Sequence, residues 1–268
     1  MSILEDIQQN LIEIGVLDPP ADGVIGPVTR WALTAIGIKT TATAEHAEDI
    51  LKKLAEKKAL ALNPGNDLAS KIVQAMERNK YWINCHHSCV NIVYIEGMDP
   101  SGKPNKNIPN HFNDLRLLIR IDHGGVPKIV GKWEATTEPG KFWTEKPMNR
   151  AGAARIKFGQ WKCWSRGIHA KHHEALVQTR ELEVFRDPQK KYQRYGSTFR
   201  GLFGINQHHG YDLRVHDLGR SSAGCLVGRT TAGHTAFMKL IKDDARFKAS
   251  GGSYRFMTTV LPASQIVA

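Results

Sequence analysis

The sequence lacks the features that would place the protein in a membrane or send it through one. No run of 18 apolar residues occurs among its 268 residues, so we expect no membrane span. The first residues, MSILEDIQQNLIEIG, lack a basic stretch followed by an apolar core, so we expect no secretory signal peptide. We therefore expect the protein to be made in the cytoplasm and to reach any target outside it by another route.

Cysteine is also scarce. The 4 cysteines are too few for a disulfide scaffold in a chain of this length, and without a signal peptide we expect reduced thiols. The stretch CHHSC at 85–89 has the residue types of a zinc site, but no second cysteine pair follows at zinc-finger spacing. We predict no metal and no cofactor, with a structural zinc at 85–89 as the alternative.

Acidic residues are outnumbered by basic ones, and the imbalance lies in one part of the chain. Residues 1–65 contain 6 Lys+Arg and 9 Asp+Glu, whereas the remainder contains 31 and 17. A basic body suits a polyanionic target such as nucleic acid, an anionic cell wall or a lipid surface. The tryptophans Trp143, Trp161 and Trp164 come without an RNA-binding signature, so we predict no nucleic-acid partner.

Hydrophobic spacing predicts a helical N-terminal part. Residues 3–16 carry apolar side chains at steps of four, four and three, which is one face of a helix. Further helices are predicted from Pro27 and over 41–62. Because NPGND at 63–67 is a turn, the pattern predicts a small three-helix bundle that ends near residue 64.

The remaining residues, 65–268, read as a second, mainly-β domain. Short runs rich in β-branched and aromatic residues are separated by Gly, Pro, Asn and Asp, and they include VNIVYIEG, LRLLIRIDH, PKIVGKWEATT, ARIKFGQWKCW and YRFMTTVL. Residues 167–187 are expected to line a cleft near Cys225, or, as the alternative, to be a polar loop followed by a strand over LEVFRD. A helix is expected over about 230–248, with His234 on its surface. The fold class predicted for the chain is therefore α+β.

The stretch GVLDPPADGVIGPVTRWALTAI resembles the type 1 peptidoglycan-binding module, a three-helix bundle. Residues 22–33 follow its D-G-x-x-G-x-x-T-x-x-A-L pattern, in which Asp22-Gly23 makes a tight turn. The glutamine that often follows this motif is absent from ALTAIGI. The resemblance implies peptidoglycan as the partner and makes Asp22 and Thr29 candidate binding residues.

Cys225 carries the strongest chemical signal in the second domain. A nucleophilic cysteine needs a base and needs donors for the oxyanion of the tetrahedral intermediate. Gly224 precedes Cys225 and lets a carbonyl approach closely. His208 and His209 lie 17 and 16 residues upstream at the end of an apolar strand. A strand end that faces the cysteine loop gives a workable Cys–His geometry.

The stretches INQHHG and SSAGC together resemble the L,D-transpeptidase catalytic domain. Ser222, Gly224 and Cys225 match its Ser/Thr-His-Gly-Cys motif, whereas Ala223 stands where the family usually has histidine. Val227 stands where the family usually has arginine. The pattern N-x-H-x-G followed by S-A-G-C, found in phage-encoded cell-wall hydrolases, is closer to this sequence and selects His208.

The resemblance implies roles for these residues. Cys225 would be the nucleophile and His208 the base, with His209 as the second candidate for the base. The N–H groups of Gly224 and Cys225 would form the oxyanion hole, and Ser222 is a secondary catalytic candidate. Arg220 or Arg229 would bind a carboxylate of the substrate by a forked contact.

These observations predict a monomeric, phage-type cell-wall lysin that attacks a stem-peptide bond of peptidoglycan through a thioacyl intermediate. Hydrolysis and transpeptidation, the bond attacked and the host stay open. One alternative is a catalytically inactive wall-binding protein, motivated by Ala223 and by the displaced arginine. Another is a zinc peptidase that uses His169, His172 and His173, although the H-E-x-x-H signature is absent.

Overall fold

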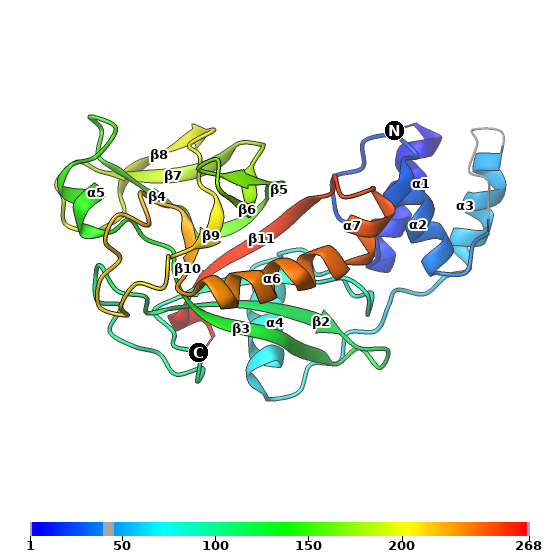
Figure 1. Ribbon diagram of the computed structural model, residues 1–268. Helices are drawn as coiled ribbons and strands as arrows, with labels where there is room; N and C mark the ends of the chain where they lie inside the picture. The colour runs from blue at the N-terminus through cyan, green and yellow to red at the C-terminus, as the bar shows by residue number, and fades with distance from the viewer. Residues whose placement is uncertain (1, 40–45, 267–268) are drawn as a thin grey trace. The chain divides into compact units, whose positions relative to one another are not determined.

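The computed structural model describes residues 2–39 and 46–266 and is a mixed α+β protein, as predicted (Figure 1). Its contacts divide it into two compact units, each built from discontinuous segments. The first unit comprises Met1–Asn91, Arg120–Lys128 and Lys242–Tyr254, and the second comprises Ile92–Ile119, Ile129–Ile241 and Arg255–Ala268. The first unit therefore extends well past the predicted boundary near residue 65.

The first unit contains helices of ordinary length, and none of the described helices of the protein is long and apolar enough to cross a membrane. Its helices are α1 (Ile3–Ile14), α2 (Pro27–Ala35), α3 (Ala47–Ala55), α4 (Leu68–Arg78) and α7 (Ala245–Ala249). A capping box of Ser2 and Glu5 starts α1, and Gly15 ends it with a φ of 93°. The helix predicted over 41–62 is shorter than expected, and residues 41–45 lie outside the described residues.

Helices α1, α2 and α3 share one apolar core. Its most deeply buried members are at most 2% exposed and include Ile7, Leu11, Leu33, Ile50 and Leu54. Burying a side chain of this size stabilises the fold by about 1.5–3 kcal/mol. The stripe read from residues 3–16 is thus confirmed at Ile7, Leu11 and Ile14, whereas Ile3, at the start of the helix, is 37% exposed.

A buried ion cluster joins the late segment of the first unit to its early residues. The guanidinium of Arg246 donates to both carboxylate oxygens of Asp18 at 2.8 and 2.7 Å and to Asp244 at 3.0 and 2.6 Å. It also donates to the carbonyl of Val90 at 2.7 Å, and the hydroxyl of Tyr254 donates to Asp18 at 2.6 Å. The three charged side chains are at most 3% exposed. Residues 228 positions apart in the chain therefore neutralise each other in the interior.

A closed barrel of eight strands forms the centre of the second unit among the described residues. In barrel order its strands are β1 (Asn91–Glu96), β11 (Arg255–Pro262), β5 (Gly159–His169), β6 (His173–Gln178), β9 (Gln207–His209), β10 (Leu226–Gly228), β3 (Pro127–Thr136) and β2 (Asp114–Ile121). The pairs β1–β11 and β9–β10 are parallel. This parallel β9–β10 pair is what positions the candidate site.

Three further strands form a separate sheet in the order β4 (Ala153–Ile156), β7 (Leu182–Asp187) and β8 (Tyr195–Gly201). The single run read from ARIKFGQWKCW is divided between β4 and β5, which belong to different sheets. The strand expected over LEVFRD is confirmed as β7, whereas the polar loop expected before it is corrected, because residues 167–178 belong to the β5–β6 hairpin.

Helix α6 (Thr231–Asp243) follows β10, but the single helix expected over 230–248 is interrupted at Asp244, which caps the separate helix α7. Helix α5 (Lys141–Glu145) is a single short turn. Phe237 of α6 meets the ring of Trp133 edge-on at a centroid distance of 5.8 Å. The guanidinium of Arg116, on β2, lies 4.4 Å from the Phe237 ring. His234 is 4% exposed, so its expected position on the helix surface was wrong. Its ring bonds to the backbone carbonyl of Glu174 at 2.9 Å, which draws it inward.

Candidate active site

The two predicted halves of the site lie on neighbouring strands. Strand β9 carries INQHHG and β10 follows SSAGC, and their parallel register pairs His208 with Val227. The N–H of Leu226 donates to the carbonyl of Asn206 at 2.9 Å and extends this pairing toward Cys225. Paired residues of a β-sheet project to the same face, and alternate residues share it. Cys225, Val227 and His208 therefore face the same side, with His208 about 7 Å further along the strands.

Cys225 is a buried thiol. It is 9% exposed and packs with Phe112, Leu218 and Val227. Its Sγ lies 3.5 Å from both the carbonyl of Gly204 and the N–H of Asn206. Burial raises the pKa of Cys225 to about 11. Among the described residues no hydrogen bond joins Sγ to an imidazole, so the resting site holds a thiol and no preformed ion pair.

The loop before Cys225 is fixed by Ser222 and Gly224. The Ser222 hydroxyl lies 2.7 Å from the carbonyl of Glu138 and 3.0 Å from that of Cys225, and it accepts the Gly224 N–H at 3.2 Å. Ser222 thus clamps the loop, and the Gly224 N–H predicted for the oxyanion hole is engaged in this state. Among the described residues, no acceptor is found for the Cys225 N–H. That N–H can therefore donate to a bound molecule.

His208 is held in one tautomer. Its Nδ1 lies 2.8 Å from the carbonyl of His209, and because a carbonyl only accepts, Nδ1 carries the proton. Nε2 therefore presents a lone pair, and it is buried without a partner among the described residues. Burial, and then the neighbouring His169, holds the pKa of His208 well below its ordinary value. His208 is thus a neutral imidazole ready to accept a proton or a cation.

His208 lies in a cluster of histidines that the sequence did not reveal. The ring of His169 stacks on it with centroids 3.9 Å apart, and the His173 ring lies 5.9 Å away. His209 contacts His173 at 4.2 Å, and the Tyr211 ring lies 6.3 Å from that of His208. Strands β5, β6 and β9 are neighbours in the barrel, which brings these residues together. The H-x₃-H spacing at 169–173 was the sequence signal for this cluster. It indicates neighbouring histidines only once the β5–β6 hairpin is known, because the hairpin pairs His169 with His173.

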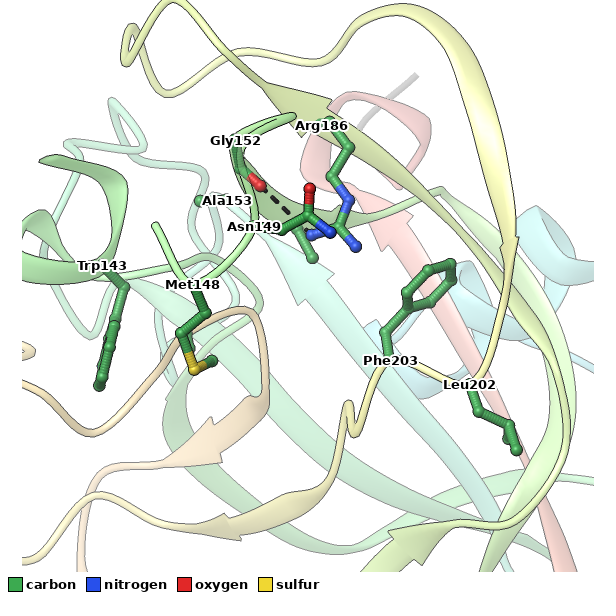
Figure 2. A pocket seen from close by; sticks show the side chains of 10 residues that line it. Trp143, Met148, Asn149, Gly152, Ala153, Arg186, Leu202 and Phe203 are labelled. Carbon is green, nitrogen blue, oxygen red and sulfur yellow. Dashed lines mark hydrogen bonds between the residues drawn. The ribbon is translucent and has the colours of Figure 1, made fainter. Parts of the chain in front are cut away.

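A pocket of about 440 Å³ opens beside the Cys225 loop (Figure 2). Ala223 lines it, together with Trp143, Met148, Phe203 and Arg186. The small side chain at position 223, where the resembling family has histidine, leaves this space open. Arg186 stands beside Phe203, with its guanidinium 5.1 Å from the ring, and it donates to the carbonyl of Gly152 at 3.2 Å. The pocket therefore offers an aromatic wall and one cation.

The two arginines predicted to bind a carboxylate have other contacts. Arg229 pairs with Glu134 and also reaches the carbonyl of Leu213 at 3.4 Å. Arg220 is exposed, and its guanidinium lies over the ring of Phe142 at 4.0 Å. Neither lines the pocket beside Ala223. Arg186, which the sequence did not single out, occupies that position.

Asp22 and Thr29, in the first unit, hold a turn. Gln8 donates to Asp22 at 2.7 Å and to Thr29 at 3.4 Å, and its oxygen accepts the N–H groups of Asp22 and Gly23. Thr29 is 4% exposed. In this structure both residues have structural contacts, and wall binding by them stays a prediction.

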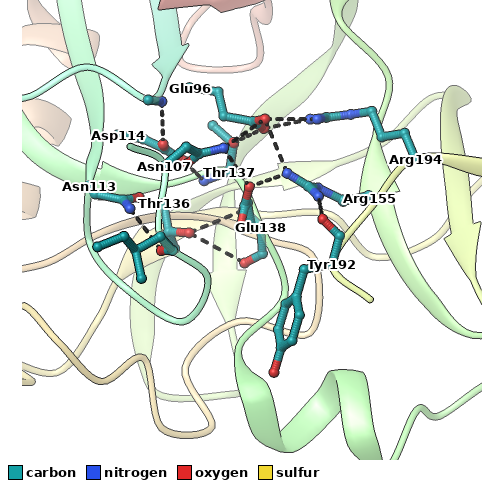
Figure 3. Close-up of polar contacts among 12 residues, drawn as sticks. Glu96, Asn107, Asn113, Asp114, Thr136, Thr137, Glu138, Arg155, Tyr192 and Arg194 are labelled. Atoms are coloured by element: carbon teal, nitrogen blue, oxygen red, sulfur yellow. Dashed lines mark hydrogen bonds and ion pairs between the residues drawn. The ribbon is translucent and has the colours of Figure 1, made fainter. Parts of the chain in front are cut away.

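A buried network of carboxylates and guanidiniums supports the cysteine loop (Figure 3). Arg155 bridges Glu96 and Glu138, and Arg194 donates to Glu96 at 2.8 and 2.5 Å. Thr137 connects a third carboxylate, Asp114, to the network. The N–H of Thr137 donates to Asp114 at 2.6 Å, and its hydroxyl donates to Glu96 at 2.8 Å. Burial and the charges of Glu96 and Glu138 raise the pKa of Asp114, and burial raises the pKa of Glu138 to about 6. The carbonyl of Glu138 accepts a hydrogen bond from the Ser222 hydroxyl, so this network helps to hold the loop before Cys225 in place.

The CHHSC stretch lies in the first unit. Cys89 is fully buried, and the rings of His87 and His123 lie with their centroids 3.8 Å apart at an interplanar angle of 30°. Within residues 2–39 and 46–266, the ligand atoms of this stretch do not form a group close enough for a metal ion. The structural zinc considered for it gains no support.

The pKa of Cys225 gives a pH-dependent expectation. Iodoacetamide should modify Cys225 at pH 7.5 on the order of 100-fold more slowly than an unperturbed thiol, since only the thiolate reacts. The rate should rise about tenfold per pH unit up to about pH 10. Peptide mapping by mass spectrometry separates Cys225 from the other three cysteines. A fast, pH-independent reaction would show a preformed thiolate–imidazolium pair and contradict this description.

Comparison with known protein families, with curated proteins and with solved structures finds no match to this chain.

Proposed function

We propose that the protein is a cysteine enzyme that transfers or hydrolyses an acyl group of a peptidoglycan stem peptide. The observation that supports this most directly is the parallel pairing of β9 and β10. It sets a buried thiol, Cys225, and a neutral imidazole with a free lone pair, His208, on one face of the barrel wall. Those are the two groups that a thiol-based acyl transfer requires.

The chemistry follows from the protonation states. The Cys225 thiol passes its proton to Nε2 of His208 as Sγ attacks the substrate carbonyl, because Nδ1 already carries a proton. The hydrogen bond from Nδ1 to the carbonyl of His209 stabilises the imidazolium that forms. The imidazolium then protonates the departing amine, which leaves a thioester on Cys225. Catalytic hydrogen bonds often close only when substrate is bound, so the resting separation is compatible with this route.

The oxyanion forms next to the Cys225 N–H. A backbone donor held in place before the reaction stabilises the developing charge without reorganisation. Ser222 and the carbonyl of Glu138 supply that rigidity. Ser222 is thus a positioning residue in the proposal, and His209 contributes its carbonyl to orient His208.

The pocket beside Ala223 is the proposed acyl-donor site. Its apolar walls fit the stem-peptide side chains, and Arg186 would pair with a free carboxylate of the peptide. The second part of the chain carries the basic excess, which favours an anionic wall. We further propose that the N-terminal helices α1–α3 act as a three-helix wall-binding module. Water as the acceptor gives a lysin, and an amine gives a transpeptidase.

The test is digestion of purified bacterial cell wall followed by mass analysis of the muropeptides. The wild-type protein should produce cleaved or exchanged stem peptides, and Cys225→Ala should lower that rate by at least about 1,000-fold. Cys163→Ala is the matched control, because Cys163 is also a buried thiol but lies away from the pocket. Activity that survives in Cys225→Ala would disprove the proposal. Unchanged muropeptides with retained pelleting on the wall would instead support a binding-only protein.

Arg186→Ala tests the substrate assignment in the same assay. Losing one charge-assisted contact should raise KM for a stem peptide with a free carboxylate by about 10- to 100-fold, with kcat little changed. The same peptide in amidated form should not distinguish Arg186→Ala from the wild type. Equal KM increases for both peptides would remove Arg186 from carboxylate recognition.

A further inference from the structure

We propose that His169, His173 and His208 bind a zinc ion, with a coordination position left open for water or a substrate oxygen. This site goes beyond the proposed cysteine chemistry. One ligand atom from each of the three side chains lies within 4.8 Å of the others, and this is the group of that kind found among the described residues. The β5–β6 hairpin supplies two of the histidines and β9 supplies the third.

The unpartnered nitrogens are the second observation. Nε2 of His208 is buried without a hydrogen-bond partner, and the His208 side chain is 1% exposed. Nε2 of His173 is also buried and without a partner among the described residues. Leaving a buried nitrogen without a hydrogen-bond partner costs free energy. A metal ion bound between the two rings would accept the lone pairs of both nitrogens.

The protonation states suit a metal ligand. Burial lowers the pKa of His173 to about 4, and burial also lowers the pKa of His169 and of His208. Neutral imidazoles bind metal ions, so no proton has to leave His208 first. The bond from Nδ1 of His208 to the carbonyl of His209 is the outer contact that metal-ligating histidines usually make.

His169 has a different outer contact. Its Nδ1 lies 2.9 Å from the amide nitrogen of Asn206, whose oxygen accepts the N–H of Gln178. The Asn206 amide therefore donates to Nδ1, and Nε2 of His169 carries the proton in this state. Metal binding through Nε2 needs the other tautomer, in which Nδ1 donates. A carboxylate at position 206 would accept that proton and favour the metal-bound form.

Three imidazoles and an open position are the donor set of catalytic zinc sites. Nitrogens around tetrahedral zinc are about 3.3 Å apart, and the three ligand atoms lie within 4.8 Å of one another, so they would have to close by at most about 1.5 Å. The hairpin end that carries His169 and His173 is half-buried, which leaves it the freedom to do so. Because Nε2 of His208 cannot hold zinc and accept a proton together, the metal-bound form and the thiol route exclude each other.

The test measures metal binding directly, in the Cys225→Ala background, so that it does not depend on the cysteine chemistry. Metal-free protein is titrated with ZnCl₂ by calorimetry and with CoCl₂ by visible absorption. We expect one equivalent to bind, and His173→Ala should weaken the affinity by at least about 100-fold. His173 is half-buried, so this variant is expected to fold, and circular dichroism verifies that it does. His172→Ala, in the exposed turn of the same hairpin, is the matched control and should bind as the parent does.

Asn206→Asp sharpens the test, because it should tighten zinc binding by about 10-fold or more. The His87→Ala/His123→Ala double variant removes the pair of neighbouring rings in the first unit and should leave binding unchanged. Absence of zinc or cobalt binding in the parent protein would overturn the site. Binding that persists in His173→Ala but is lost in the His87→Ala/His123→Ala variant would overturn it as well.

Discussion

Replacing Arg246 by methionine should lower the melting temperature of the first unit by roughly 6 to 20 °C. The substitution leaves Asp18 and Asp244 buried together without their counter-charge, at 2% and 0% exposure. Removing one partner of a buried ion cluster costs about 3–5 kcal/mol, because the remaining charge has lost both water and its pair. For a protein of this size each kcal/mol shifts the melting temperature by about 2–4 °C. Thermal unfolding followed by circular dichroism measures the change.

Lys53→Ala is the control for Arg246→Met. Lys53 pairs with Asp49 at 2.6 Å on α3, but both side chains are at least half exposed. Solvent screens such a pair, so its loss should move the melting temperature by no more than about 2 °C. Equal shifts for Arg246→Met and Lys53→Ala would show that the buried cluster does not hold the first unit together.

Gly224→Ala should both destabilise the second unit and expose the thiol of Cys225. Gly224 has a φ of 129°, which L-residues rarely adopt, and an added Cβ would lie 2.5 Å from the carbonyl oxygen of Ala154. Backbone strain and overpacking each cost about 1–3 kcal/mol, so the melting temperature should fall by roughly 5 to 20 °C. Because the loop must move away from Ala154, the Gly224–Ser222 contact should break. Iodoacetamide should then modify Cys225 faster than in the wild type.

Gly196→Ala separates the backbone strain of the substitution from the collision of the added Cβ. Gly196 also has a positive φ, of 60°, but an added Cβ there would meet nothing within 4 Å. This control carries the conformational strain without the collision and should leave the alkylation rate of Cys225 unchanged. If Gly224→Ala melts no lower than Gly196→Ala and alkylates at the wild-type rate, the close packing against Ala154 is not what fixes the cysteine loop.

Much of the secondary structure was predictable because its signals are local. Each of these signals lies within a few residues of the element that it predicts. They are the apolar stripe over 3–16, the proline that opens α2 and the β-rich runs of β1, β2, β3 and β11. The division of 154–164 between two sheets was not predictable. Strand runs look alike whichever partner they pair with, and the partner is chosen by packing.

The candidate site was partly predictable for the same reason. INQHHG and SSAGC carried recognisable residue types, and the structure places INQHHG around strand β9 and SSAGC in the loop that leads into its neighbour β10. Nothing in the sequence linked His169 and His173 to His208, and its pattern placed His234 on the surface of a helix. Those relations depend on the β5–β6 hairpin and on its neighbour β9, which join residues up to 39 positions apart.

By itself, then, the sequence determined most of the helices and strands, the α+β class and the position of the cysteine loop in the chain. Only the tertiary structure decided which charges are neutralised in the interior, which arginine lines the pocket and which histidines meet. The physical reason is that periodicity, capping and turn chemistry act between near neighbours in the chain. Burial, in contrast, pairs groups such as Asp18 and Arg246 that are 228 residues apart, and it decides their protonation and their chemistry.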